Sequence, residues 1–243
     1  MAGKILTILS NEAIADRTYK MVLRGEGIPA TLPGQFINIL LPDFFLRRPM
    51  SIASRDEETL NIYYRTVGNG TRRMSQLAAG EKLDVLVGLG NGFSLHPTEG
   101  KRILLIGGGL GTAPLIGLAQ VLKEQGRVFD AVIGFGEQKA VFGYNELRNC
   151  AANLTVTTID GSNGTKGLVT DVIDAQKYSY YFACGPEKML RAVHRLSIEG
   201  QLSFEARMGC GFGACMGCSC RTLAGTKRIC LEGPVMKSTE IYF

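Results

Sequence analysis

The first hundred residues alternate apolar and polar positions in short runs, a pattern typical of β-strands with one buried face. Turn residues such as Pro33 and Gly34 separate these runs. Short strands at this spacing predict an antiparallel barrel or sandwich. One helix is expected here, over 71–79, with Thr71 as its cap. The expected strands cover residues 18–24, 35–41, 59–67 and 82–87.

The pattern changes after Pro97, where apolar runs begin to alternate with helical stretches. Such alternation predicts βαβ units and a parallel sheet. Strands are expected over 102–106, 128–135, 154–159 and 180–184, and helices over 113–125 and 187–199. We therefore predict a β-barrel plus an α/β fold. Its three parts are an antiparallel barrel over 1–98, a parallel-sheet α/β domain over 99–203 and a small Cys-rich segment over 204–243.

The composition is that of a folded globular chain. Of the 243 residues, 45% are apolar and 20% charged, and 27 Lys and Arg against 22 Asp and Glu give a net charge of +5. This excess is not gathered into a basic block, so we expect no nucleic-acid partner. Residues 103–122 carry no charge, but their glycines and Pro114 suit a strand, loop and helix better than a membrane span. With only a short apolar run at 5–9, no leader is expected, and we predict a cytoplasmic protein that does not enter a membrane.

Five of the seven cysteines fall within 21 residues. The spacing Cys210-x4-Cys215-x2-Cys218-x11-Cys230 matches that of plant-type [2Fe–2S] sites, so these four residues are the expected metal ligands. A structural zinc site is the alternative, although zinc ribbons favour two C-x2-C pairs. Cys220 could exchange with Cys218, whereas the isolated Cys150 and Cys184 are read as small buried residues.

Arg48-Pro49-Met50-Ser51 is the first candidate for binding a nucleotide. The Arg48 guanidinium offers a planar fork to a phosphate, Ser51 offers a hydroxyl and Pro49 stiffens the turn. Taken alone, this motif would equally suit a solvated arginine in a loop.

A second candidate, Tyr63-Tyr64-Arg65, lies a few residues before Gly70-Thr71. It combines aromatic rings, another guanidinium and a Gly-x-Gly-Thr turn at a helix start, where backbone N–H groups can hold a pyrophosphate. One of the two tyrosines is expected to serve ordinary strand packing.

Glycine-rich turns occupy the ends of two expected parallel strands, where α/β proteins bind their ligands. A tight turn without a ligand is the alternative, because the spacing is not the usual G-x-G-x-x-G. The candidate nucleotide-binding residues are Gly107, Gly108, Gly109, Gly111, Thr112 and Pro114 in one turn, and Cys184, Gly185 and Pro186 in the other.

Together these motifs resemble the ferredoxin–NADP reductase superfamily. The cysteine cluster followed by Glu232-Gly233-Pro234-Val235 narrows the resemblance to electron-transfer subunits of class 1B dihydroorotate dehydrogenases, over essentially the whole chain. This resemblance implies FAD bound by residues 48–51, 63–65 and 70–71. It also implies a [2Fe–2S] cluster on the four cysteines and NAD at residues 107–114 and 184–186.

The resemblance also implies a partner: an FMN-containing dihydroorotate dehydrogenase catalytic subunit, in a heterotetramer of two catalytic and two electron-transfer subunits. Electrons would pass from FMN through the cluster and FAD to NAD⁺, in pyrimidine biosynthesis. No acid or base catalyst is expected, and His96 and His194 are read as surface or packing residues. Two alternatives stay open. One is a reductase module serving ferredoxin or a sulfur compound; the other is a redox-sensing binding protein without turnover, which two nucleotide sites and a cluster disfavour.

The nucleotide preference is predicted from the end of the second parallel strand, where the sequence reads Gly134-Phe135-Gly136-Glu137-Gln138-Lys139. A 2′-phosphate usually meets an arginine at this position, and Glu137 would repel it, with Lys139 as the nearby cation. NADH is therefore expected to be used in preference to NADPH.

Overall fold

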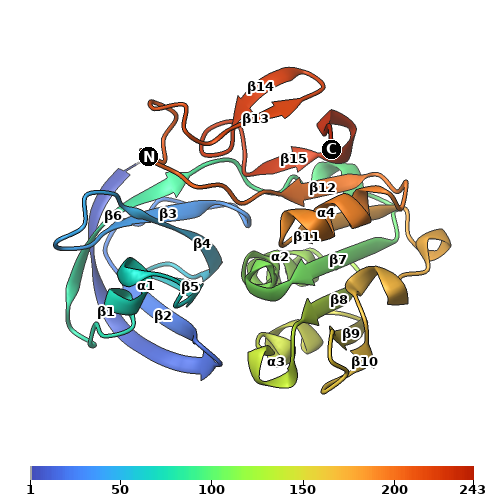
Figure 1. Cartoon of the computed structure of the whole chain (residues 1–243), viewed down its shortest axis with the longest axis horizontal. Helices are drawn as coiled ribbons and strands as arrows, with labels where there is room; N and C mark the ends of the chain where they lie inside the picture. Colours follow the sequence, from blue (N-terminus) through green and yellow to red (C-terminus); the bar gives the residue numbers. More distant parts are fainter. Residues whose placement is uncertain (1) are drawn as a thin grey trace.

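The computed structural model describes residues 2–243 and contains a barrel, an open sheet and a small hairpin (Figure 1). The barrel is closed and six-stranded, in the order β1-β2-β5-β4-β3-β6, and every pairing in it is antiparallel. Its elements are β1 (Ala2–Ala15), β2 (Thr18–Arg24), β3 (Phe36–Leu40), β4 (Arg48–Arg55), β5 (Thr59–Arg65), α1 (Asn69–Met74) and β6 (Lys82–Leu89). The predicted antiparallel barrel is confirmed.

The barrel closes because its strands alternate and bend. Along β6, Leu83, Val85 and Val87 are buried inside the barrel and the residues between them face outward. The long strand β1 pairs with both β6 and β2, and its register shifts twice, between Ile8 and Ser10 and again near its end. Such bulges let one strand curve around a barrel.

The second sheet has seven strands in the order β10-β9-β8-β7-β11-β12-β15. All neighbouring pairs are parallel except β12 with β15, so the predicted parallel sheet is confirmed. Its strands are β7 (Ile103–Gly108), β8 (Phe129–Phe135), β9 (Asn153–Thr158), β10 (Thr165–Lys166), β11 (Tyr180–Cys184), β12 (Gly200–Ser203) and β15 (Val235–Lys237). The α-helices here are α2 (Thr112–Glu124), α3 (Tyr144–Arg148) and α4 (Glu187–His194).

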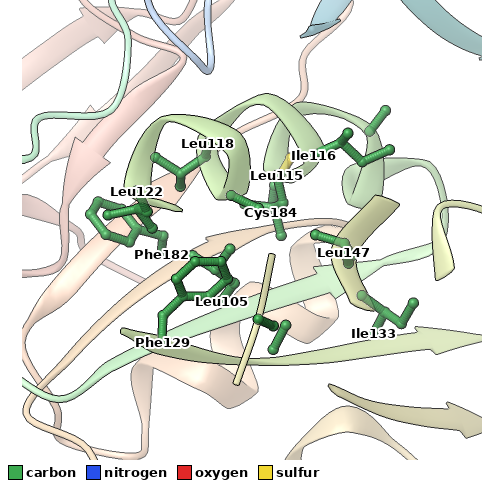
Figure 2. Close-up of a cluster of buried hydrophobic side chains, with 14 of the residues drawn as sticks. Leu105, Leu115, Ile116, Leu118, Leu122, Phe129, Ile133, Leu147, Phe182 and Cys184 are labelled. Atoms are coloured by element: carbon green, nitrogen blue, oxygen red, sulfur yellow. The ribbon is translucent and has the colours of Figure 1, made fainter. Parts of the chain in front are cut away.

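Helix α2 lies between the two sheets. One side packs on the parallel sheet, where Leu115, Leu118 and Leu122 meet Phe129 and Phe182 in a buried cluster (Figure 2). The other side faces the barrel so closely that a Cβ on Gly117 would lie 2.4 Å from the carbonyl oxygen of Ala53 in β4. This close approach fixes the barrel against the α/β part, which positions any ligand bound between them.

The C-terminal segment is tied to both larger parts. Its hairpin consists of β13 (Ser219–Thr222) and β14 (Gly225–Arg228), and β15 then joins the parallel sheet. On the barrel side, Asn38 Nδ2 donates to the carbonyl oxygen of Cys210 at 3.1 Å, and Asn91 exchanges hydrogen bonds with the backbone of Val235 at 2.7 and 2.9 Å. The predicted boundaries at 98/99 and 203/204 stay predictions.

Two helices differ from their predicted extents. Helix α1 begins at Asn69, because the Thr71 hydroxyl oxygen reaches back to accept from the N–H groups of Val67 (2.9 Å) and Gly68 (3.1 Å). Helix α4 ends at His194, and Ser197 adopts a positive φ of 57° before β12 begins. Within residues 2–243, no helix is long and apolar enough to cross a membrane. Single 3₁₀ turns cover His96–Thr98, Gly109–Gly111, Gln138–Ala140, Val169–Val172, Ala175–Lys177 and Ser238–Glu240.

Candidate cofactor sites

A cavity of about 460 Å³ lies where the barrel meets the α/β part. The barrel contributes strands β4 and β5, and the α/β part contributes the turn before α2 and the end of β11. The C-terminal segment forms another wall, from Ser203 to Met208. Of the predicted flavin and nucleotide residues, the cavity is lined by Pro49, Met50, Ser51, Tyr63, Tyr64, Arg65, Thr71, Gly108, Gly109, Gly111, Pro114, Cys184 and Pro186.

Arg48 lies outside this cavity, beside Gly70. Its guanidinium carbon is 4.6 Å from the centre of the Phe44 ring, and it donates to the carbonyl oxygen of Leu46. A Cβ on Gly70 would lie 2.1 Å from Arg48 Nε, so glycine is the residue that leaves room for this side chain. No carboxylate pairs with Arg48 in the described part of the chain, which leaves its charge available to an anion.

Both tyrosines of the second motif are packing residues as well as cavity walls. Tyr63 stacks on Phe142 with ring centres 5.3 Å apart and donates to Glu146 at 3.0 Å. Tyr64 is fully buried in the barrel and donates to Asn11 Oδ1 at 2.7 Å. Burial raises the pKa of both phenols, and the charge of Glu146 raises that of Tyr63 further. Their hydroxyls are therefore neutral and already engaged within the protein.

The glycine turn between β7 and α2 brings backbone close to the cavity. Gly109 has a φ of +52°, and a Cβ on Gly111 would lie 2.3 Å from the carbonyl oxygen of Cys184, so a side chain is excluded there. Helix α2 begins at this turn without a side-chain cap or an acidic residue in its first turn. The N–H groups at its start donate to the carbonyl oxygens of Gly109 and Leu110 in the preceding turn, so what this end of α2 offers a phosphate group is its positive dipole.

A second cavity, also about 460 Å³, lies at the carboxyl ends of β7, β8 and β9. It shares Arg65, Gly108, Gly109 and Pro186 with the first, so a ligand in one can approach a ligand in the other. Its other lining residues, which the sequence analysis did not single out as binding residues, are Gly134, Phe135, Gly136, Thr157, Ile159, Gly167, Leu168, Val169, Thr170, Lys188, Met189 and Ala192. The rule that parallel strands end at a common ligand-binding crevice could have indicated the first five.

Not every predicted nucleotide residue borders a cavity. Gly107 and Thr112 are buried behind the turn, and a Cβ on Gly107 would lie 2.9 Å from Thr112 Oγ1. Gly185 has a φ of +159°, which helps the chain turn between Cys184 and Pro186. Glu137 borders a small cavity of about 100 Å³ and lies 3.3 Å from Lys139 Nζ, which it partly neutralises.

The predicted cluster ligands come together in two pairs. In the first, the N–H of Cys210 donates to the sulfur of Cys215 and the N–H of Cys215 to the sulfur of Cys210, both at 3.4 Å. Burial acts to raise the pKa of Cys210, but the N–H groups of Phe212, Cys215 and Ala214 outweigh it and lower this pKa to about 6. A loop of N–H groups directed at a sulfur is what a bound thiolate requires.

The second pair consists of Cys218 and Cys230, where the N–H of Cys230 donates to the sulfur of Cys218 at 3.4 Å. Burial and the neighbouring Cys218 raise the pKa of Cys230 to about 12. Two pairs suit a dinuclear cluster, in which each iron takes two thiolates. Across the described residues, no three Cys, His, Asp or Glu side chains gather as they would around a single ion. Cys220 lies on β13, and Cys150 lies outside this segment.

Comparisons with known proteins agree with this geometry. The iron-sulfur cluster binding domain of dihydroorotate dehydrogenase B matches residues 205–242. A protein of Bacillus velezensis named dihydroorotate dehydrogenase B (NAD(+)), electron transfer subunit, is 43% identical over 250 residues, covering 97% of both chains. The chain belongs to this family. A further member, from Fusobacterium nucleatum, is 38% identical and covers 97% of this chain and 96% of its own.

The predicted resemblance to electron-transfer subunits of dihydroorotate dehydrogenase is therefore confirmed. Among solved structures, one described as an NADH-dependent reduced ferredoxin-NADP oxidoreductase superimposes with a TM-score of 0.86 at 26% identity, over 98% of this chain and 89% of that one. A cytochrome P450 reductase of Amycolatopsis shares the fold, with a TM-score of 0.67 and 22% identity, over 81% of this chain and 67% of that one. Together with the family match, this likeness supports FAD, a [2Fe–2S] cluster and NAD as the cofactors of a flavin and iron–sulfur oxidoreductase subunit.

Proposed function

We propose that this chain transfers electrons between a catalytic subunit that oxidises dihydroorotate and NAD⁺, in pyrimidine biosynthesis. One observation carries the proposal: the segment that ends in Cys210 also forms a wall of the first cavity, which in turn shares a wall with the second. The candidate cluster site therefore begins two residues after Met208 in the wall of the first cavity, and the first cavity borders the second. When bound, the cluster supplies one-electron transfer, and FAD supplies the exchange between single electrons and a hydride.

The residues around the first cavity would hold the flavin. Pro49, Met50 and Ser51 line it from β4, while Arg48 and the glycine at position 70 lie just outside, where the guanidinium can meet a phosphate. Tyr63, Tyr64 and Arg65 line it from β5, and Thr71 stiffens the turn before α1. We propose these residues as the FAD site.

The second cavity would take NAD⁺ or NADH. Gly108 and Gly109 line this cavity and let the backbone approach the nucleotide, Gly107 and Gly111 keep the turn tight behind them, and α2 begins at this turn with its positive end. The predicted turn residues Thr112, Pro114, Cys184, Gly185 and Pro186 shape the two strand ends. Because the dividing wall at Gly108 and Gly109 carries no side chain, a nicotinamide ring can reach the flavin cavity directly.

The four cysteines 210, 215, 218 and 230 would hold the cluster, and the exposed surface around them would meet the partner. Phe212, Met216 and Leu231 are 42%, 53% and 46% exposed. Apolar side chains beside an electron-transfer centre suit a protein interface. The proposed partner is an FMN-containing catalytic subunit in a heterotetramer of two catalytic and two electron-transfer subunits. We propose that this chain functions in the cytoplasm, where reducing conditions keep clustered thiols available to iron.

The test is reconstitution with purified proteins. The isolated chain should oxidise NADH with artificial acceptors but should not oxidise dihydroorotate. Adding the FMN-bearing subunit should create dihydroorotate-dependent NAD⁺ reduction and a stable complex. If the isolated chain reduced NAD⁺ with dihydroorotate by itself, or if no mixture gained activity, the proposal would be wrong. Reduction of ferredoxin or of a sulfur compound instead would favour a reductase serving another partner.

A further inference from the structure

Arg228 lies among the candidate cluster ligands and has so far been given no role. It ends β14, two residues before Cys230. Its guanidinium forms a forked ion pair with Glu232, in which Nε donates to both carboxylate oxygens at 3.1 Å and Nη2 donates to Oε1. Both side chains are partly buried. The guanidinium is therefore held in one orientation by a partner of its own segment.

The same two residues shape the turn that carries Cys230. The carboxylate of Glu232 accepts from the backbone N–H of Arg228 at 2.7 Å. In return, the carbonyl oxygen of Arg228 accepts from the N–H groups of Leu231 at 3.0 Å and Glu232 at 2.9 Å. The backbone around the second cysteine pair is thus organised by Arg228.

The remaining guanidinium nitrogen reaches the loop of the first cysteine pair. Arg228 Nη1 donates to the carbonyl oxygen of Gly213 at 2.7 Å. That carbonyl belongs to the same peptide group as the N–H of Ala214, which donates to the sulfur of Cys210 at 3.2 Å. Because a trans peptide group is planar and its C=O and N–H point in opposite directions, a bond that fixes the carbonyl also fixes where the N–H points. A Cβ on Gly213 would lie 2.7 Å from Leu231 Cδ2, so this loop packs directly on the turn of the second pair.

We propose that Arg228 is a positioning residue for the cluster: it directs the peptide N–H of Ala214 at the sulfur of Cys210 and thereby raises the reduction potential of the cluster. Reduction adds one electron, and so one negative charge, to the cluster and its thiolates. N–H groups directed at the sulfurs favour this more negative state. Glu232 offsets the charge of the guanidinium, so the oriented peptide is expected to contribute most of the effect. The inference rests on the proposed function only in taking the four cysteines as the cluster ligands.

The experiment measures the reduction potential of the cluster by spectroelectrochemical titration of protein loaded with FAD and the cluster. Arg228→Leu should lower the ratio of reduced to oxidised cluster at a fixed potential roughly tenfold, equivalent to about 59 mV for a one-electron couple. The double variant Arg228→Leu/Glu232→Gln has the net charge of the wild type and keeps an acceptor for the N–H of residue 228, and it should retain most of this decrease. Recovery of the wild-type potential in the double variant would mean that charge alone acts, and would overturn the inference.

A matched control comes from the same hairpin. Arg221→Leu removes an exposed arginine of β13 and should leave the potential unchanged. Hydrogen–deuterium exchange over residues 211–216 should be faster in Arg228→Leu than in the wild type, and unchanged in Arg221→Leu. Equal exchange, or equal potentials, in the wild type and Arg228→Leu would overturn the inference.

Iron content per FAD is measured for every variant. If Arg228→Leu does not retain the cluster, Arg228→Gln replaces it, because this shorter neutral side chain can still donate to Glu232 but cannot also span to Gly213. A lowered potential in Arg228→Gln supports the inference, and a wild-type potential overturns it. Failure of the dihydroorotate reconstitution would leave these potentials unaffected, so the two proposals fail separately.

Discussion

Two regions of this protein are built in opposite ways: the cleft, which is made up of the first and second cavities, and the cluster segment, which carries Cys210, Cys215, Cys218 and Cys230. The cleft is formed mainly by backbone and packed side chains from strands far apart in the sequence, fixed by the tight contact of α2 with both sheets. The cluster ligands are four side chains within 21 residues, held by loop N–H groups and by a few hydrogen bonds to the barrel. Binding in the cleft should therefore tolerate the loss of a single side chain but be weakened when an added group fills space. Cluster binding, in contrast, should be lost when a single sulfur atom is removed.

The sharpest test of this contrast is Cys215→Ser. The hydroxyl is a harder and poorer iron ligand than a thiolate, so the cluster should be lost completely while FAD is retained. Cluster content is measured by iron and acid-labile sulfide analysis of anaerobically purified protein. The wild type should contain two irons and two sulfides per FAD. Cys150→Ser should keep the cluster. Stoichiometric zinc in the wild type in place of iron would contradict the assignment.

On the cleft side, Gly111→Ala should have the next largest effect. The added methyl group would lie 2.3 Å from the carbonyl oxygen of Cys184, which must move. Overpacking of this kind costs about 1–3 kcal/mol of unfolding free energy and would displace the turn that faces both cavities. Thermal unfolding and NADH titration measure the two effects. Gly3→Ala, where the nearest atom would lie 3.9 Å away, should change neither.

The cleft should also discriminate between NADH and NADPH by charge. Glu137 should repel a 2′-phosphate, and its contact with Lys139 keeps the nearby cation occupied. NADH should therefore reduce the flavin with a kcat/KM roughly 10- to 100-fold above that of NADPH. Glu137→Gln should narrow this ratio. Comparable values in the wild type would refute the prediction.

The smallest expected effect concerns the outward surface of the cluster segment. Phe212→Glu and Met216→Glu should each weaken the complex with the catalytic subunit by roughly tenfold, because a charge would replace apolar contact area. NADH oxidation with artificial acceptors should stay within twofold of the wild type, as a rough limit. Val128→Glu, at an exposed apolar position just before β8, is the matched control and should not weaken the complex.

The same contrast explains what could be predicted from the sequence. The cluster site could be predicted from the cysteine spacing because its four ligands lie close together in the chain. The strands of the parallel sheet could be predicted because they are apolar runs. Strand β1 was not predicted, because the exposed Ile5 and Leu9 flank the buried Leu6 and Ile8 and so break the alternation of apolar and polar residues. Strand β4 was not predicted either, because it begins with Arg48 and Pro49.

The cleft was harder to predict because its walls meet only in three dimensions. The wall from Ser203 to Met208 gives no local signal: it precedes the cysteine cluster without a motif of its own, and it reaches the first cavity because β12 lies beside β11. Tyr63 and Tyr64 were predicted as ligand contacts from their residue type, and both line the first cavity; their packing was not predicted, because neighbouring strand residues point to opposite faces and each ring is also buried in a different core. Which residues line the cavity therefore depends on which strands lie side by side, and the local sequence does not reveal this.

The parallel sheet finishes on one side with β10, which has two residues, and on the other with β15, which has three. An exposed edge strand offers unpaired N–H and C=O groups to other chains, and shortening it is a common protection against aggregation. A barrel has no free edge at all. Association by adding a strand is therefore disfavoured at both edges of the parallel sheet and around the barrel. A redox partner that meets these two parts of the molecule is therefore expected to be recognised by side chains and by shape, and not by strand pairing.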